Sequence, residues 1–358
     1  MVNWSIGELV NRLIGELVNW RIGKSVNWSI GELVNRLIGK NFNKEVIRKM
    51  LRTFNEVLEK AKHYGPKKMS VAAAQAEDVL QAVEAARQEG LTNSILVGDK
   101  KEIIQIANKM GIDPTNYEII DQIDKAEAAR CAVELVRNKR VSILMKGMMG
   151  TARILKAVLD KEVGLRTDRM LSHVYTLEVK NYDRLLTMTD GAMCISPDLK
   201  QKAQIIQNAI YYAHSLGIEK PKVAVVGALE LVNPDMPATI DAACLSKMSE
   251  RGQIIGGIVD GPLGFDNAIS KEAALYKGIE SPVSGEIDII LVPNIEAGNI
   301  FAKGLVYLAK AVPAGLLLGA KAPVVLVSRS DSAQSKLYSI ALGVLMSEIT
   351  EIKPNQMI

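Results

Sequence analysis

Two hydrophobic patterns alternate along most of the chain. Apolar residues spaced three or four positions apart predict amphipathic helices at 42–58, 79–90, 101–111 and 126–138. Segment 69–78 reads as a strand, a turn and a helix start, and short apolar runs predict buried strands at 94–99, 141–147, 222–228, 254–261, 287–294 and 322–329. Helices that alternate with buried strands are typical of a mostly parallel sheet covered on both faces. The sequence therefore predicts an α/β fold.

The first 40 residues follow a different pattern. They divide into five octads, MVNWSIGE, LVNRLIGE, LVNWRIGK, SVNWSIGE and LVNRLIGK. Eight residues advance a helix by about 80° beyond two full turns, so the repeat cannot keep one apolar stripe on one helix face. The Gly in each octad weakens both a helix and a strand, and all three tryptophans of the chain lie here. We interpret the octads as a passenger extension, with an association segment or a binding segment as alternatives.

Composition narrows the class of protein. A chain of 358 residues is long enough for two domains. Its net charge of +4 is too small and dispersed to indicate nucleic-acid binding, and no apolar run approaches the ~20 residues of a membrane span. Cys131, Cys194 and Cys244 form no CxxC pair, which argues against a disulfide framework or a zinc site. We therefore expect a cytoplasmic protein.

Proteins with parallel sheets bind ligands where strands end and helices begin, so these junctions are where we expect the functional residues. In segment 144–159, Lys146 and Gly147 precede Thr151, which opens a predicted helix where anions would be attracted. An ordinary strand–helix turn explains this segment equally well. The spacing is neither that of a Walker A loop nor GxGxxG.

Four later junctions carry further candidates. Arg329 has the planar fork that grips phosphate or carboxylate, although a solvated loop is the alternative. Asp260 lies six residues before Asp266 across a Gly-Pro turn, a spacing that we interpret as loop chemistry rather than a metal site. The candidates at these junctions are Asn233, Asp260, Glu296, Gly298, Asn299, Lys303, Ser328, Arg329 and Asp331.

Taken in order, these segments resemble the phosphate acetyl/butyryltransferase family, most closely its butyryl-transferring members. The resembling segments are MKGMMGTARILKAVL, KEVGLRTDRMLSHV, VNPDMPATIDAACLSKMSERGQI, GGIVDGPLGFDNAIS, DIILVPNIEAGNIFAKGLVYLAKA and GAKAPVVLVSRSDSAQSKLYSIAL. The likeness extends from about Met50 to Glu348, and the octads lie outside it.

The resemblance implies a fold and a reaction. The fold would consist of two three-layer αβα domains with mostly parallel sheets and an interdomain cleft, similar to isocitrate and isopropylmalate dehydrogenases. A repeat extension and lead-in helix at 1–49 would precede domain I, at 50–164 plus 311–358, and domain II, at 165–310. The reaction would convert butanoyl-CoA and phosphate reversibly to butanoyl phosphate and CoA. No cofactor or metal is implied, the partners are these substrates, and a homodimer or larger homo-oligomer is expected.

The resemblance also implies roles for individual residues. Arg329 would bind the phosphoryl group and Ser328 would help to stabilise the transition state. Lys146, Gly147 and Thr151 would form part of the cleft wall. The Gly-Asn…Lys pattern of the acetyl-transferring relatives matches Gly298, Asn299 and Lys303, and the remaining substrate-binding candidates are His173, Asn233, Asp260 and Glu296.

The general base departs from the family pattern. Acetyl-transferring relatives have an acidic residue six positions after the matching Arg, where this chain has Ser335. Asp331, two positions after Arg329, is the candidate base. His173 is the other titratable candidate because its reference pKa suits proton transfer, although a structural role is the alternative.

Three other functions remain as alternatives. The first is a phosphate acetyltransferase that uses acetyl-CoA. The second is a dehydrogenase on the related fold, which would need NAD, a divalent metal and several converging Asp residues. The third is a non-catalytic protein that binds CoA or phosphate.

Overall fold

The computed structural model describes residues 50–328 and 331–351, with side chains up to position 349. The described residues belong to one compact unit. The octads, the predicted helix at 42–49, and two residues of the fifth junction, Arg329 and Ser330, lie outside the described residues.

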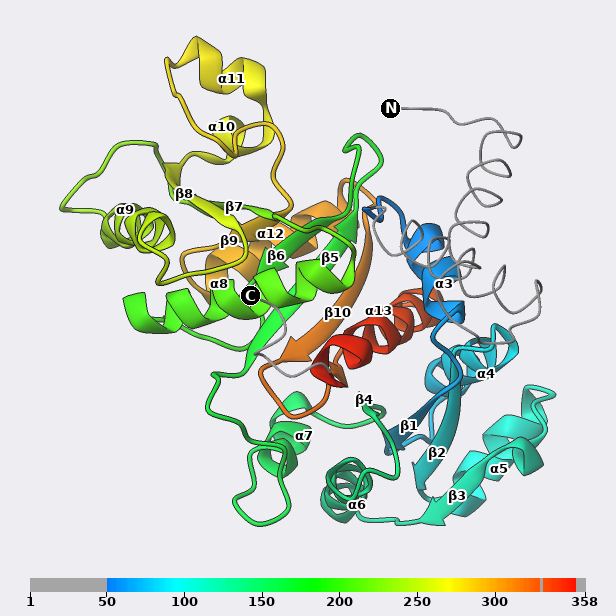
Figure 1. The fold of residues 1–358 in the computed structure, drawn as a ribbon. Helices are drawn as coiled ribbons and strands as arrows, with labels where there is room; N and C mark the ends of the chain where they lie inside the picture. Colours follow the sequence, from blue (N-terminus) through cyan, green and yellow to red (C-terminus); the bar gives the residue numbers. More distant parts are fainter. Residues whose placement is uncertain (1–49, 329–330, 352–358) are drawn as a thin grey trace, which may run out of the picture. The chain divides into compact units, whose positions relative to one another are not determined.

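The described strands form one mixed sheet that is mostly parallel (Figure 1). Its eleven strands follow the order β3-β2-β1-β4-β11-β10-β5-β6-β9-β7-β8. Only the three pairs in the middle, β11–β10, β10–β5 and β5–β6, are antiparallel. The bounds are β1 Lys67–Ala72, β2 Thr92–Gly98, β3 Glu118–Asp121, β4 Ile143–Lys146, β5 Ser172–Glu178, β6 Leu186–Thr189, β7 Lys222–Val226, β8 Ile258–Leu263, β9 Ile289–Leu291, β10 Val312–Leu318 and β11 Val324–Val325.

Helices connect most of these strands. In chain order they are α3 Phe54–Lys62, α4 Glu77–Gln88, α5 Lys100–Lys109, α6 Lys125–Arg137, α7 Thr151–Val158, α8 Leu199–Ser215, α9 Pro237–Glu250, α10 Phe265–Ile269, α11 Lys271–Tyr276, α12 Ile295–Tyr307 and α13 Ala333–Glu351, with a 3₁₀ turn at Pro114–Asn116. The α/β prediction is confirmed, because the predicted strands alternate with helices and pair largely in parallel.

The two faces of the sheet are covered differently. On one face a single apolar cluster runs through both halves of the sheet beneath α3, α4, α8, α9 and α13. On the other face there are two separate clusters, one beneath α6 and α7 and one beneath α10 and α12. The middle strands border both clusters, because Leu317 of β10 belongs to the first and Tyr175 of β5 packs against the second.

Two sequence predictions need correction. The predicted helix at 42–58 does not include residues 50–53, because α3 begins at Phe54. The N–H groups of this first turn have their own partners: Thr53 Oγ1 accepts from Glu56 N at 3.2 Å and Glu178 Oε2 accepts from Phe54 N at 2.6 Å. Such capping is typical of the first turn of a helix, so residues 50–53 precede α3. The strand predicted at 254–261 begins at Ile258, after Gly256 turns the chain with φ +83°.

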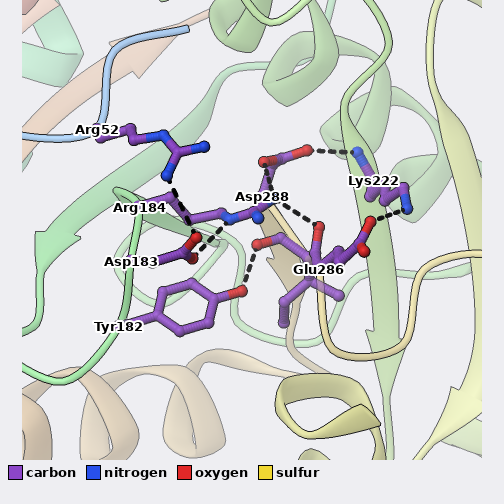
Figure 2. A network of polar contacts seen from close by, with 8 residues as sticks. Arg52, Tyr182, Asp183, Arg184, Lys222, Glu286 and Asp288 are labelled. Atoms are coloured by element: carbon purple, nitrogen blue, oxygen red, sulfur yellow. Dashed lines mark hydrogen bonds and ion pairs between the residues drawn. The ribbon is translucent and has the colours of Figure 1, made fainter.

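A network of hydrogen bonds and ion pairs links the chain segments at which β6, β7 and β9 begin (Figure 2). Buried Asp288 accepts from the backbone N–H of Lys222 at 2.8 Å and lies 3.5 Å from Arg184 Nη1. Burial raises the pKa of the Asp288 carboxyl, while these two partners oppose that rise. Arg184 also pairs with Asp183, which Arg52 contacts at 3.4 Å. The network joins the β5–β6 turn, the start of β7 and the segment before β9.

Candidate active site

A cavity of about 290 Å³ opens over the middle strands, where the two apolar clusters are separated. The loop after β11 contributes Ser328 and Asp331 to its lining, and the start of α7 and α12 contribute further lining residues. We call it the site cavity. Its lining residues are Thr151, His173, Tyr175, Met188, Gly191, Ala192, Ile295, Asn299, Ala302, Lys303, Val306, Tyr307, Leu326, Val327, Ser328 and Asp331.

Asp331 is held against the end of β11 by its own loop. Its Oδ2 accepts from Ser328 N at 2.9 Å, and its backbone N–H donates to Ser328 O at 3.2 Å. Buried Lys336 donates to the Asp331 carbonyl and pairs with Asp78 of α4 at 2.8 Å. Burial raises the pKa of the Asp331 carboxyl, while the Ser328 N–H and the nearby charges of Lys336 and Lys146 oppose this rise. The carboxyl is therefore a stronger base than an ordinary surface carboxylate.

His173 of β5 lies at the base of the site cavity and is 3% exposed. Its Nε2 is 3.0 Å from the carbonyl oxygen of Leu326, and because a carbonyl only accepts, Nε2 carries the proton. In the neutral ring, Nδ1 is then an acceptor, and it has no hydrogen-bond partner among the described residues. Burial is the main cause that lowers the pKa of His173, opposed chiefly by Asp190. A neutral imidazole with a vacant acceptor thus borders the cavity.

Two residues that the sequence interpretation did not single out hold His173 in place. Asp190 is a buried carboxylate that accepts from the backbone N–H groups of His173, Ala192 and Met193, each at 2.8 Å. Gly315 lies across from Tyr175 in β10, and a Cβ there would meet His173 Nε2 and Leu326 O at 2.9 Å each. Tyr175 itself lines the cavity, and burial raises its pKa. The alternation of β5 is the signal that could have located Tyr175, once His173 was suspected.

The first junction divides into structural and cavity-lining residues. Thr151, the first residue of α7, lines the site cavity. Gly147 permits a close backbone crossing, since a Cβ would lie 2.2 Å from Ala73 O. Lys146 ends β4, is 4% exposed and is not among the lining residues; its Nζ lies 3.4 Å from Met149 O.

The fourth junction places α12 along the cavity. Lys303 is exposed and Asn299 Nδ2 donates to Gly191 O at 3.3 Å. Gly298 lets the helix approach closely, because a Cβ there would lie 2.7 Å from Gly191 Cα. Glu296 is exposed and does not line the cavity.

The second and third junctions lie away from the site cavity. Asn233 caps its own turn, with Oδ1 accepting from Asp235 N at 2.9 Å and its N–H donating to Thr239 Oγ1. Asp260 accepts from Ser246 Oγ at 3.0 Å and Ser281 Oγ at 2.5 Å. Asn233 follows β7 and Asp260 belongs to β8, which are the last two strands at one side of the sheet. Neither residue is among those that line the site cavity.

Known proteins share this chain's sequence and fold. A family model for phosphate acetyl/butaryl transferase matches residues 122–344. Phosphate butyryltransferase of Clostridium acetobutylicum is 49% identical over 298 residues, which cover 83% of this chain and 99% of the relative. This chain belongs to the phosphate acetyl/butyryltransferase family.

Other members of this family match the chain over similar lengths. Phosphate acetyltransferase of Thermotoga maritima is 46% identical over 292 residues, 82% of this chain and 99% of the relative. A crystal structure of a branched-chain phosphotransacylase from Enterococcus faecalis superimposes with a TM-score of 0.70 at 32% identity, covering 78% of this chain and 99% of that one. As a family member, this chain is a phosphate acyltransferase, an enzyme that exchanges CoA and phosphate on an acyl group.

The described residues do not form the group of carboxylates that the dehydrogenase alternative requires. It required converging carboxylates, but Asp260 bonds to serines whereas Asp266 pairs with Lys277 at 2.9 Å. Within residues 50–328 and 331–351, no three His, Cys or carboxylate side chains are grouped so that they could hold a metal ion. None of the helices in these ranges is long and apolar enough to span a bilayer.

Proposed function

We propose that this acyltransferase converts butanoyl-CoA and phosphate reversibly to butanoyl phosphate and CoA in the site cavity. The observation that carries the proposal is that one small cavity is lined by both apolar and polar side chains. Met188, Ile295 and Val306 line this cavity and offer apolar contacts to a short acyl chain, while Ser328 and Asp331 add polar groups to the same lining. Acetyl-CoA is the second candidate substrate, because the acetyl-transferring relative is nearly as similar as the butyryl-transferring one.

The reaction needs an anion held against a thioester carbonyl. A phosphate oxygen attacks the carbonyl carbon, the C–O bond forms, and the C–S bond breaks. In this proposal Arg329 grips the phosphate as a bidentate fork, and Lys303 at the cavity contributes a second cation. Ser328 supplies a donor where negative charge develops on the carbonyl oxygen. Thr151 and Asn299 line the remaining wall and orient the substrates, while Lys146 adds positive charge from behind it.

The proton of hydrogen phosphate must reach the departing sulfur. We assign its transfer to Asp331, whose carboxyl is at the cavity and whose raised pKa favours accepting a proton. His173 is the second candidate, favoured by its vacant Nδ1 acceptor. In the reverse direction the same group takes the proton from the CoA thiol as sulfur attacks the acyl phosphate. Ser335, buried and bonded to Ser332, offers no acid in its place.

The finer organisation of the enzyme is also part of the proposal. Two domains, 50–164 plus 311–358 and 165–310, would each carry one of the separate apolar clusters and would enclose the site between them. The enzyme would work without a cofactor in the cytoplasm, as a homodimer or larger homo-oligomer. The roles of Asn233, Asp260 and Glu296 would be confined to supporting their loops.

Thiol release tests the proposed reaction. Butanoyl-CoA mixed with phosphate should release free thiol without added NAD or metal, and a series of acyl-CoA esters should show whether butanoyl or acetyl is preferred. Absence of release across all chain lengths would exclude the acyltransferase activity. Arg329→Ala should raise the KM for phosphate and lower kcat, whereas Arg137→Ala, at the exposed end of α6, should leave both unchanged. Unchanged kinetics in the Arg329 variant would remove that residue from the site.

The two proton-transfer candidates can be separated by isosteric substitution. His173→Gln retains a side-chain N–H that can reach the Leu326 carbonyl but has no basic Nδ1. Asp331→Asn retains an oxygen that can accept from Ser328 N but has no basic carboxylate. The variant that removes the true acceptor should lose about 10²–10⁴-fold in kcat together with one limb of the pH profile. The other variant should keep that limb.

A further inference from the structure

Tyr175 lines the site cavity, and the proposed reaction as described so far gives it no role. It belongs to β5, two residues after His173, so both side chains lie on the same face of that strand. The centroids of the two rings are 5.8 Å apart. In the neighbouring strand β6 the residue opposite Tyr175 is Met188, which also lines the cavity. Tyr175 is therefore a neighbour both of a candidate base and of a residue that offers apolar contacts to the acyl chain.

The hydroxyl of Tyr175 makes no hydrogen bond with another residue in the described part of the chain. Two other tyrosines whose rings pack into apolar clusters do make one. Tyr182 donates to Ile287 O at 2.7 Å, and the hydroxyl of Tyr212 lies 2.6 Å from Thr176 Oγ1. A polar group that is removed from water without gaining a partner costs free energy. A half-buried donor of this kind in a cavity lining is suited to a ligand that accepts a hydrogen bond.

The electrostatics of Tyr175 keep it a donor. Burial is the main cause that raises its pKa, and like-charge repulsion from Asp331 and Tyr307 raises it further. Both of these residues line the site cavity, so the charges that act on the phenol come from the cavity. Because the pKa is raised, the phenol remains protonated and presents an O–H group at neutral pH.

The proposed reaction needs a donor at the carbonyl oxygen of the thioester. When a phosphate oxygen attacks the carbonyl carbon, the π electrons of the C=O bond move to the carbonyl oxygen, which becomes negative. They return to re-form C=O as the C–S bond breaks and sulfur leaves with its electron pair. A donor that is already fixed in place stabilises this negative oxygen without reorganising. The ring of Tyr175 is fixed by packing against the apolar cluster beneath α10 and α12.

We propose that the Tyr175 hydroxyl donates a hydrogen bond to the acyl carbonyl oxygen and is a further catalytic residue of this enzyme, beside Ser328. The acyl chain extends toward Met188, the cross-strand neighbour of Tyr175. Tyr175 keeps its proton throughout the reaction. This inference rests on the proposed function, because the oxygen that accepts the hydrogen bond belongs to the acyl-CoA thioester.

Removal of a single oxygen atom tests this role. Tyr175→Phe keeps the ring and its packing but lacks the donor. With butanoyl-CoA and phosphate, its kcat should fall about 10²-fold, the usual effect of losing one such donor. The KM for each substrate should change little, because the hydrogen bond strengthens only as the oxygen becomes negative. The kcat with a second ester that the wild-type enzyme accepts, such as acetyl-CoA, should fall by the same factor, since the carbonyl is common to both esters.

Tyr182→Phe is the matched control. The hydroxyl of Tyr182 donates to the Ile287 carbonyl, and neither residue is among those that line the site cavity. The loss of this bond should lower the melting temperature and leave kcat unchanged. Tyr175→Phe should show the reverse, a lower kcat at an unchanged melting temperature, because no group of the described chain loses a hydrogen-bond partner.

Three results in the Tyr175 variant would overturn the proposal. An unchanged kcat would show that the hydroxyl does not act in the reaction. A loss confined to the KM for phosphate would place the hydroxyl at the phosphate, and a loss that differs between the two esters would make the ring a wall of the acyl pocket. If instead the wild-type enzyme released no thiol from any acyl-CoA, the proposed function itself would fail, so this failure is distinguishable from that of the Tyr175 role.

Discussion

Gly315→Ala adds one methyl group beside the hydrogen bond between His173, a candidate base, and the carbonyl of Leu326. The added Cβ would lie 2.9 Å from both His173 Nε2 and Leu326 O, the two atoms of a 3.0 Å hydrogen bond. One of these atoms belongs to the backbone and the other to a buried ring, so neither can move freely. Overpacking costs about 1–3 kcal/mol, and separating the bonded pair leaves buried polar atoms unpaired at about 1–3 kcal/mol. Because the two costs overlap, we expect a loss of about 2–4 kcal/mol in the free energy of unfolding.

Gly304→Ala is the matched control, because its Cβ would meet nothing within 4 Å and the residue lies within α12. There the extra methyl should stabilise the protein by about 0.5–1 kcal/mol. Urea unfolding followed by circular dichroism measures both variants. Leu326 is two residues before Ser328, so Gly315→Ala should also lower kcat/KM by up to about 10²-fold through displacement of that loop. A Gly315 variant as stable and active as the Gly304 variant would refute this account of the His173–Leu326 contact.

Three further outcomes follow from the structure. Burial raises the pKa of Asp331 in the folded protein above the unfolded value of 3.8. As pH rises from 3.8 through the folded pKa, the buried carboxyl therefore lowers the stability of the protein by an increasing amount. Thermal unfolding should accordingly show a larger stability advantage of Asp331→Asn over wild type at pH 7 than at pH 4. Thr53→Ala should cost about 1 kcal/mol of unfolding free energy by removing the cap on α3, whereas Thr53→Ser should not. Deleting residues 1–40 should leave thiol release unchanged, since the described residues that line the site cavity begin at Thr151 and the family resemblance begins at about Met50; lost activity would show that the octads contribute.

The sequence was informative about the fold wherever periodicity was strong and local. Helices α4, α5 and α6 and strands β2 and β4 lie where the pattern predicted them. The middle strands β5, β6 and β10 were not predicted. A short apolar run does not reveal its partner, and β5 pairs with β10 across more than a hundred residues, for example Val174 with Leu316. Pairing at such distance is decided by packing of the whole sheet.

The same reasoning explains what could be predicted of the candidate site. Thr151, Asn299, Ser328 and Asp331 follow the ends of strands, where ligands of α/β proteins bind, and the structure brings them to one cavity. Asn233 also lies beyond a strand end, yet β7 lies near the sheet edge and the cavity lies over its middle. The strand order cannot be predicted from the junctions themselves, because every junction has the same strand–loop–helix pattern wherever its strand lies in the sheet.

By itself, the sequence determined the chemical inventory of this protein: an α/β scaffold, a set of cationic and hydroxyl side chains at its loops, and the family resemblance that they carry. Only the tertiary structure decided which of these groups meet. Gly315 and Asp190 became relevant through the register of β10 with β5 and the turn after β6, where they hold His173 against Leu326. The physical reason is that side-chain chemistry belongs to single residues, whereas proximity depends on long-range strand pairing and on how closely backbones can approach.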